Sequence, residues 1–168
     1  MPFDDPTELF YLVDKTDKVL GSVARNVAHS DRTKIHRAVD ILVINQNQLL
    51  LQKRSVHKDT NPGLWTISAS GHVTFGQSYE YAAKRELKEE LGIKSKLRFI
   101  GKLLFDSGIE QEFSSVYETE YNETPTHYDK SEVEKVMWVN LEDLPTFISQ
   151  NKVTASAIQV LSFAGYIK

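Results

Sequence analysis

The 168-residue sequence contains no cysteine. This absence excludes disulfide frameworks, thiolate zinc sites and thiol nucleophiles. A chain of this length can bury a substantial core without such cross-links. The lack of cysteine also suits a reducing compartment, so we expect a cytoplasmic protein.

The sequence also has no long apolar run and no excess of positive charge. Its longest apolar stretches, such as residues 41–44, are too short to cross a bilayer. The first ten residues lack the basic stretch and apolar core of a signal peptide, so we expect none. The formal net charge of -3 argues against a broad basic surface for a nucleic acid polymer. We therefore expect neither a membrane nor nucleic acid as a partner.

The composition is that of an ordinary soluble domain, with 40% hydrophobic and 26% charged residues. No internal repeat, low-complexity run or linker interrupts it. We expect one domain over residues 1–168.

Alternating or β-branched apolar segments predict strands, whereas segments rich in Ala, Leu, Glu and Lys predict helices. The expected strands are residues 8–13, 18–23, 38–44, 49–54, 64–69, 96–105, 112–121 and 133–139. The expected helices are residues 77–91, 141–150 and 154–163. Because the two kinds do not alternate strictly, we expect an α/β domain with a mixed β-sheet and helices packed on it.

Three glutamates share one face of the helix expected at residues 77–91. Glu86, Glu89 and Glu90 are spaced i, i+3 and i+4. Like charges at this spacing repel by roughly a few tenths of a kcal/mol per pair. A solvated acidic face and a divalent metal site explain the helix equally well by themselves. Carboxylates suit magnesium, which keeps its other positions for water and substrate phosphates.

The segment containing these glutamates resembles the Nudix box. That box reads Gly, five residues, Glu, seven residues, Arg-Glu, an aliphatic residue, any residue, Glu-Glu, any residue, Gly and an aliphatic residue. The matching positions are Gly71, Arg85, Glu86, Leu87, Glu89, Glu90, Gly92 and Ile93. Gln77 stands where the box has Glu, which keeps the hydrogen-bonding reach but loses a charge. The change puts metal affinity or loop rigidity in question.

The resemblance implies a Nudix-like α/β/α sandwich and metal-assisted water attack on a diphosphate linkage in a nucleotide or other small diphosphate compound. Glu86, Glu89 and Glu90 would hold magnesium, or manganese in its place. The candidate catalytic residues are Glu89, Glu86 and Glu112. Arg85 is expected to be structural and to lie away from the glutamate face. A homodimer is a further option that the family offers.

Three residues are candidates for holding the substrate's phosphates. Gly71 lets the backbone approach a phosphate closely. Lys53 and Arg54 end an expected strand and would steer an anion, although a plain polar strand end explains them equally well. Trp65 could stack on a base, but core packing is the better explanation.

Outside the box, the chain resembles the branch of the Nudix family that includes isopentenyl-diphosphate isomerase. The likeness lies in Leu12-Val13-Asp14, His36-Arg37-Ala38, Gln52-Lys53-Arg54 and Pro62-Gly63-Leu64-Trp65. That branch builds a second metal site from three histidines and two glutamates. The matching positions here are His29, His36, His72, Glu110 and Glu112. This donor set suits manganese or zinc. His57 and His127 match nothing and are expected at the surface.

The isomerase activity itself is a weaker alternative. Its proton-transferring cysteine would fall at about Ser70, and a serine hydroxyl is a poor proton donor or acceptor near neutral pH. The complete glutamate trio favours a hydrolase, that is, a diphosphatase. A non-catalytic ligand-binding Nudix module is the third alternative. Such a module would be expected to lose the carboxylates that this sequence keeps.

Overall fold

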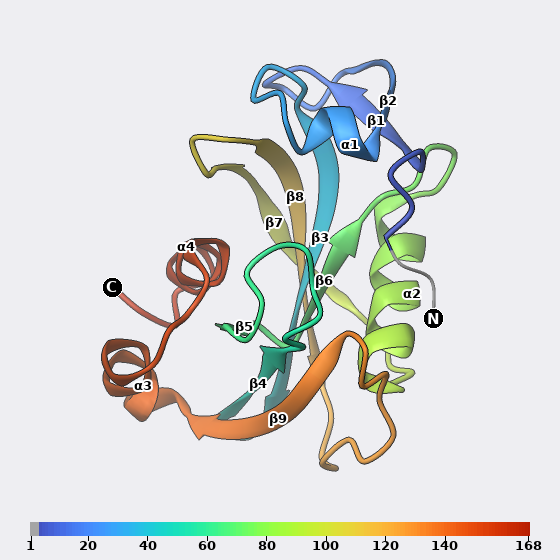
Figure 1. The fold of residues 1–168 in the computed structure, drawn as a ribbon. Coiled ribbons are helices and arrows are strands. Elements are labelled where there is room, and N and C mark those ends of the chain that lie inside the picture. Colours follow the sequence, from blue (N-terminus) through green and yellow to red (C-terminus); the bar gives the residue numbers. More distant parts are fainter. Residues whose placement is uncertain (1–3) are drawn as a thin grey trace.

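Strand β3 (His36–Asn45) is the centre of the fold (Figure 1). The structure is a computed structural model, and it describes residues 4–168. Hydrogen-bonded ladders join β3 to a parallel neighbour, β8 (Gln111–Glu120), and to an antiparallel neighbour, β6 (Ala69–His72). The sheet is therefore mixed, as the order of expected elements predicted.

The other strands extend the sheet on both sides of β3. Strands β4 and β9 lie antiparallel to each other, as do β7 and β8, and β1 and β2. Their bounds are β1 Leu9–Val13, β2 Val19–Ala24, β4 Gln48–Arg54, β5 Trp65–Thr66, β7 Arg98–Asp106 and β9 Val133–Asn140. The helices are α1 Arg25–Ala28, α2 Tyr79–Leu91, the 3-10 turn η1 Leu141–Asp143, α3 Leu144–Gln150 and α4 Ala155–Phe163.

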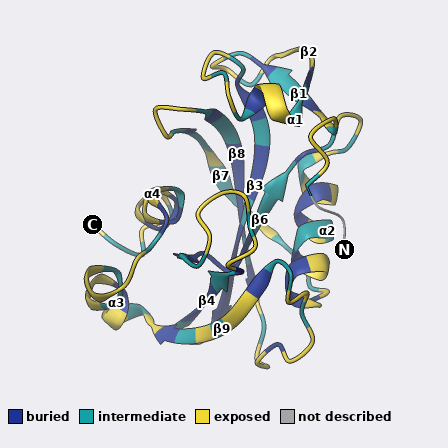
Figure 2. Cartoon of the chain, in the orientation of Figure 1, coloured by how far each residue is buried: buried dark blue, intermediate teal, exposed yellow. Residues whose placement is uncertain are grey.

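Helices cover both faces of the sheet because β3 is apolar on both sides. Val39, Ile41 and Val43 pack against α2, in one buried cluster. Leu42 and Ile44 point the other way and pack in a second cluster with residues of α3 and α4. Buried residues follow β3 and the inner side of α2 in Figure 2. The predicted α/β/α sandwich is confirmed.

Helix α2 begins and ends close to where the sequence predicted. Ser78 caps its start by accepting a hydrogen bond from the backbone N–H of Tyr81 at 3.1 Å. Gly92 ends it in the left-handed conformation, with φ 69°. The Ser78 cap and the Gly92 stop both act on adjacent residues, so the ends of this helix could be predicted from the sequence.

The strand expected at residues 64–69 is wrong as a single element. It is divided into β5 and β6 because Ser68 leaves the ladder pattern. The Ser68 hydroxyl donates to the carbonyl of Leu50 at 2.6 Å and accepts from the backbone N–H of Val43 at 2.8 Å. The short helix α1 was not predicted. No helix among residues 4–168 is long and apolar enough to cross a membrane.

Candidate functional site

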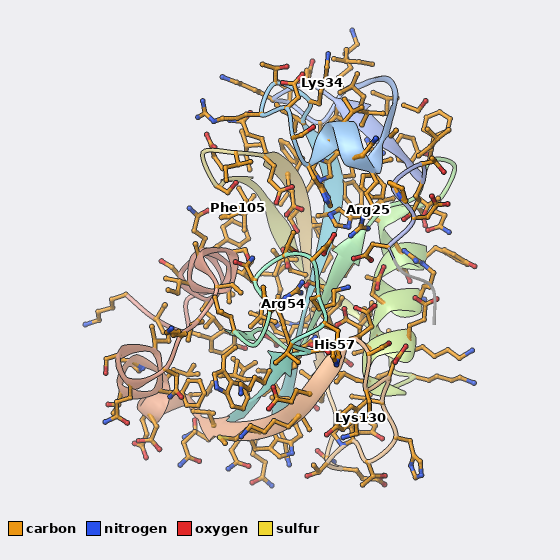
Figure 3. All side chains as sticks on the ribbon, in the orientation of Figure 1. Arg25, Lys34, Arg54, His57, Phe105 and Lys130 are labelled. Atoms are coloured by element: carbon orange, nitrogen blue, oxygen red, sulfur yellow. The ribbon has the colours of Figure 1, made fainter. Side chains whose placement is uncertain are left out.

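A cleft of about 830 Å³ opens in the part of the chain that the structure describes. Its floor is the junction of β3, β6 and β8, and one wall is α2. Loop residues between β4 and β5 and the start of α4 line other sides. Figure 3 shows the side chains, with Arg25 of α1 and Arg54 of β4 labelled, both of which line this cleft.

The three glutamates of α2 line the cleft together, as the helical spacing predicted. Glu89 is the most exposed, at 59% of its side chain, whereas the Glu86 side chain is 13% exposed. Glu90 is buried and accepts a hydrogen bond from the Gln52 amide at 2.5 Å. It also accepts from the backbone N–H of Ser70 at 3.3 Å. The sheet thus fixes the carboxylate of Glu90, and the carboxylate of Glu89 faces solvent.

Burial and crowding disfavour charge on the two inner carboxylates. Burial is the main cause that raises the pKa of Glu86 well above its usual range, and the nearby Glu90 adds to the effect. Burial likewise raises the pKa of Glu90 to about 7, although the hydrogen bond from Gln52 opposes the shift. A divalent cation would offset this repulsion, and its preferred ligands are such oxygens. The donor set therefore fits magnesium.

Arg85 lies within this group, so the expectation that it points away from the glutamates is wrong. Its guanidinium contacts Glu86 at 2.8 Å and Glu89 at 3.7 Å. It also donates to the carbonyl of His72 at 2.9 Å. Arg85 thereby ties α2 to β6, which agrees with the structural role expected for it.

Gln77 lies in the loop before α2. Its side-chain oxygen is buried and has no hydrogen-bond partner among the described residues. The backbone N–H of Gln77 donates to the carbonyl of Thr74 at 2.9 Å, which closes the turn. The turn is therefore held by the backbone rather than by this side chain.

A fourth glutamate reaches the trio from a distant part of the chain. Glu132 precedes β9, and its charge raises the pKa values of both Glu86 and Glu90. Lys58 holds Glu132 by an ion pair of 2.6 Å. The sequence reasoning missed Glu132, because nothing in the polar stretch before β9 distinguishes it.

The expected second group of ligands also comes together, on the far side of Gly71 from the glutamates. Ligand atoms of His29, His36, His72 and Glu112 all lie within 4.8 Å of one another. Glu112 Oε1 lies 3.1 Å from His72 Nε2 and 3.4 Å from His36 Nε2. Glu110 approaches from the side, with 3.7 Å between its Oε2 and His29 Nε2. Four distant segments supply these five residues.

The protonation states of this cluster suit a metal ion. Burial is the main cause that lowers the pKa of His29 to about 3, and it lowers the pKa of His72 as well. Burial alone would raise the pKa of Glu112, but interactions with His36 and His72 hold it well below its usual range. Neutral imidazoles and an ionised carboxylate are what metal binding requires. Two buried atoms, His36 Nε2 and Glu110 Oε2, have no hydrogen-bond partner among residues 4–168.

Phe10 packs against all three imidazoles, a role that no sequence pattern indicated. Its fully buried ring is stacked on His72, with centroids 4.5 Å apart, and on His36 at 5.4 Å. It also contacts His29 in a tilted arrangement at 5.9 Å. One aromatic side chain therefore restricts the orientation of all three rings.

The two ligand groups are separated by a short stretch of floor. Gly71 and Ser70 of β6 lie between the glutamates and His72. Asp40 of β3 pairs with Ser70 across the ladder and lines the same cleft. The sequence reasoning did not select Asp40, which reads as one polar residue in an apolar strand.

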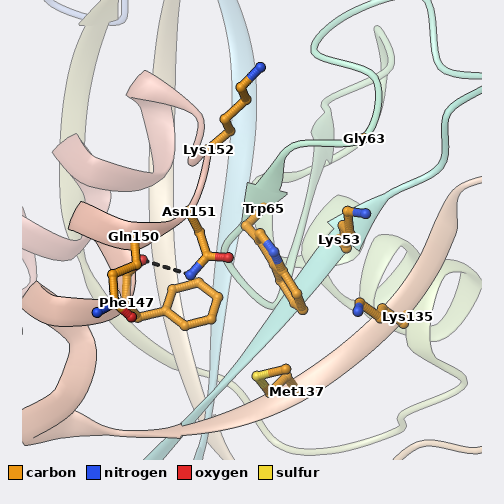
Figure 4. Close-up of a pocket in the computed structure, with 9 residues that line it drawn as sticks. All are labelled: Lys53, Gly63, Trp65, Lys135, Met137, Phe147, Gln150, Asn151 and Lys152. Atoms are coloured by element: carbon orange, nitrogen blue, oxygen red, sulfur yellow. Dashed lines mark hydrogen bonds between the residues drawn. The ribbon is translucent and has the colours of Figure 1, made fainter.

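The two basic residues expected to steer an anion lie in different places. Arg54 lines the cleft, but Lys53 does not. Lys53 points to the opposite side of β4 and lines a separate hollow with Trp65 and Lys135 (Figure 4). Trp65 is only 6% exposed and packs edge-on against Phe147, as core packing predicted. His57 and His127 are both exposed, also as expected.

Comparisons with known proteins agree with this site. A family model described as the NUDIX domain matches residues 34–160. An isopentenyl-diphosphate Delta-isomerase 2 from Photorhabdus laumondii is 35% identical over 148 residues, which cover 84% of this chain and 82% of the relative. A protein from Pseudomonas aeruginosa named as an uncharacterized Nudix hydrolase is 33% identical over 137 residues, covering 80% of each chain.

Solved structures show the same fold. A crystal structure from Deinococcus radiodurans superposes with a TM-score of 0.78 and 26% identity, covering 92% of this chain and 98% of that one. A MutT Nudix hydrolase from Burkholderia pseudomallei gives a TM-score of 0.64 at 22% identity, over 76% of this chain and 96% of that one.

Proposed function

Because the chain belongs to the Nudix family, in the branch that resembles isopentenyl-diphosphate isomerase, we propose that its cleft hydrolyses a diphosphate linkage in a small molecule with the help of a divalent metal. The observation that carries the proposal is the position of Glu86, Glu89 and Glu90. All three line the cleft, and Glu90 is held in place by hydrogen bonds from the Gln52 amide and the backbone N–H of Ser70.

Glu86, Glu89 and Glu90 would hold magnesium in this proposal, with manganese as the alternative ion. A metal ion bound there would neutralise the charge that develops on the diphosphate oxygens. Glu90, which is buried, and Glu86, whose side chain is 13% exposed, would act as the ligands least accessible to solvent. Glu89 is exposed to the cleft and accepts the proton of the attacking water. Glu112 is engaged by His36 and His72, so we assign it to the histidine cluster rather than to proton transfer.

Arg54 is the basic residue best placed to bind the anionic substrate. Among the described residues, its guanidinium donates to the backbone oxygen and hydroxyl of Thr60 and forms no ion pair. Lys58, by contrast, is already paired with Glu132 and Asp4. A guanidinium without an ion pair can make charge-assisted hydrogen bonds to a phosphate group without first releasing a carboxylate. The backbone of Ser70 and Gly71 borders the same space.

The isomerase remains a second candidate because one observation favours it. The histidine cluster assembles with the donor set that the isomerase branch uses, and several relatives carry that name. Against it stands the side chain at the proton-transfer position, which is Ser70 here. No thiol exists anywhere in the chain to replace it.

The first experiment is a panel of diphosphate compounds, including isopentenyl diphosphate, incubated with magnesium or with manganese. Release of phosphate or of a monophosphate would be measured for wild type, Glu89→Gln and Glu80→Gln. Glu80 lies on the same helix, is 62% exposed and pairs with Lys84, so it is a matched control. We expect release that Glu89→Gln abolishes and Glu80→Gln preserves. Isomerisation of isopentenyl diphosphate without any release of phosphate or monophosphate would contradict the proposal. If no compound is either hydrolysed or isomerised, a non-catalytic binding module is favoured.

A further inference from the structure

The hollow beside Trp65 lies on the side of β4 opposite the cleft. Its volume is about 490 Å³, which is within the range of small-molecule pockets. Strands β4, β5 and β9 form one side of it, and the end of α3 with the segment that follows forms the other (Figure 4). Three of the nine residues that line it are lysines, and none of the nine is an aspartate or glutamate. In a chain with 23 acidic and 20 basic residues, the hollow is a local excess of positive charge.

Two of these lysines face each other across the sheet. Lys53 of β4 is paired with Lys135 of β9 in the antiparallel ladder, so their side chains share one face. Like charges directly opposite each other destabilise a sheet. Lys53 forms an ion pair with Glu134 at 3.2 Å, but both side chains are partly exposed, so this pair offsets little of the repulsion. An anion bound between the two ammonium groups would offset it directly.

Trp65 lies beside the two lysines because it is opposite Lys53 in the ladder between β4 and β5. Lys135 Nζ lies 5.5 Å from the centre of the Trp65 ring, and this contact keeps the ammonium group at the hollow. Figure 4 shows the third lysine, Lys152, on the other side of Trp65. Among residues 4–168, neither Lys135 nor Lys152 forms an ion pair. Their charges are therefore available to a ligand.

We propose that this hollow binds a small organic phosphate. The phosphate group lies between Lys53 and Lys135, and the apolar part of the ligand contacts Met137 and Phe147, which line the same hollow. Lysine suits a phosphate because its ammonium group is a compact charge with three donors. Met137 is 40% exposed, and covering it with an apolar group is favourable. The hollow shares no lining residue with the cleft, so the inference does not depend on the proposed function.

The test is a titration with phenyl phosphate, in the presence of a chelator so that no metal ion draws the anion into the cleft. Two-dimensional NMR follows the indole N–H signals of the two tryptophans, Trp65 and Trp138. We expect a saturable shift of the Trp65 signal. The signal of Trp138, whose N–H donates to Thr124 at 3.0 Å, should stay unchanged. Inorganic phosphate should bind about 10-fold more weakly, because it leaves the apolar side chains uncovered.

Three single variants locate the bound anion. Lys135→Met should weaken phenyl phosphate binding by about 10-fold, which is typical for loss of a hydrogen bond from a charged group. Lys94→Met is the matched control, because Lys94 is exposed and lines neither the hollow nor the cleft. Arg54→Met should also leave the binding unchanged, since Arg54 lines the cleft and not the hollow.

Three results would overturn the inference. The first is the absence of a saturable shift of the Trp65 signal in about 0.15 M salt, where weak long-range attraction is screened. The second is equal weakening by Lys135→Met and Lys94→Met, because net charge alone would then attract the anion. The third is weakening by Arg54→Met alone, which would place the anion in the cleft.

Discussion

The side chain of Glu86 lies directly over Gly71. A β-carbon at position 71 would stand 2.6 Å from Glu86 Cγ and would collide with the carboxyl group as well. The first glycine of the Nudix box is thus explained by its contact with the first glutamate of the trio, fifteen residues later. Because Gly71 has no side chain, β6 leaves room for the carboxylate of Glu86.

The variant Gly71→Ala should therefore displace Glu86. We expect magnesium affinity to fall by about 10-fold or more, because groups that orient a ligand typically contribute this much. Magnesium titration followed by calorimetry measures it. Ser70→Ala is the neighbouring control, since only the backbone N–H of Ser70 holds Glu90. If Gly71→Ala binds magnesium as wild type does, Glu86 is not a ligand.

Arg54 and Lys53 form a natural pair for testing substrate binding. They are adjacent in β4, but one lines the cleft and the other lines the hollow beside Trp65. Arg54→Met should raise KM by about 10-fold through loss of a charged hydrogen bond. Lys53→Met should leave KM unchanged. Steady-state kinetics on a substrate found in the panel decides between them, and equal effects would show that neither residue binds the anion.

Phe10 should control the histidine cluster. Phe10→Leu keeps an apolar side chain but removes the ring that contacts all three imidazoles. We expect affinity for manganese or zinc to fall by about 10-fold, with magnesium binding at the glutamates unaffected. Tyr11→Leu is the control, because Tyr11 points to the other side of β1, toward Phe75. Unchanged manganese and zinc binding in Phe10→Leu would show that Phe10 does not position the imidazoles for metal binding.

The buried Glu90 should make stability depend on pH when no metal is bound. Its folded pKa of about 7 exceeds its usual value of 4.5, so the folded state binds more protons between these pH values. The stability that protonated Glu90 contributes is complete below about pH 4.5 and is lost as the pH rises through 7. In chelator-treated protein, the free energy of unfolding of Glu90→Gln should therefore rise relative to that of wild type between pH 5 and pH 8, by up to about 3 kcal/mol.

Urea denaturation of both proteins at pH 5 and pH 8 measures this gain. Added magnesium should reverse the order at pH 8, since only wild type keeps the full set of ligands. If the difference in stability between wild type and Glu90→Gln does not change with pH, the charge of Glu90 does not destabilise the folded protein.

Features that depend on residues close together in the sequence were predicted correctly. Ser78, Gly92 and the glutamate spacing lie within one helix, so the cap, the end and the shared carboxylate face were all readable from the sequence. The β-branched apolar run at residues 38–44 likewise predicted a strand, and β3 forms there with most of its side chains buried. The break between β5 and β6 was missed because it depends on Ser68 bonding to two other strands.

The remainder of the site depends on contacts that no local pattern encodes. His29, His36, His72 and Glu112 come from separate segments, and only resemblance to a family selected them. No sequence pattern marked Asp40 or Glu132, because their positions in the site depend on residues that are distant in the sequence and face them across the cleft. The separation of Lys53 from Arg54 follows from strand alternation, which the sequence did contain.

The most direct test of the central claim uses water enriched in oxygen-18. If water attacks phosphorus, one labelled oxygen must enter the phosphate or monophosphate product for each linkage cleaved, and Glu89→Gln should abolish its incorporation. The account predicts this label in the products of at least one diphosphate compound. Unlabelled diphosphate throughout, together with conversion of isopentenyl diphosphate to its dimethylallyl isomer, would contradict the account and assign the cleft to isomerisation.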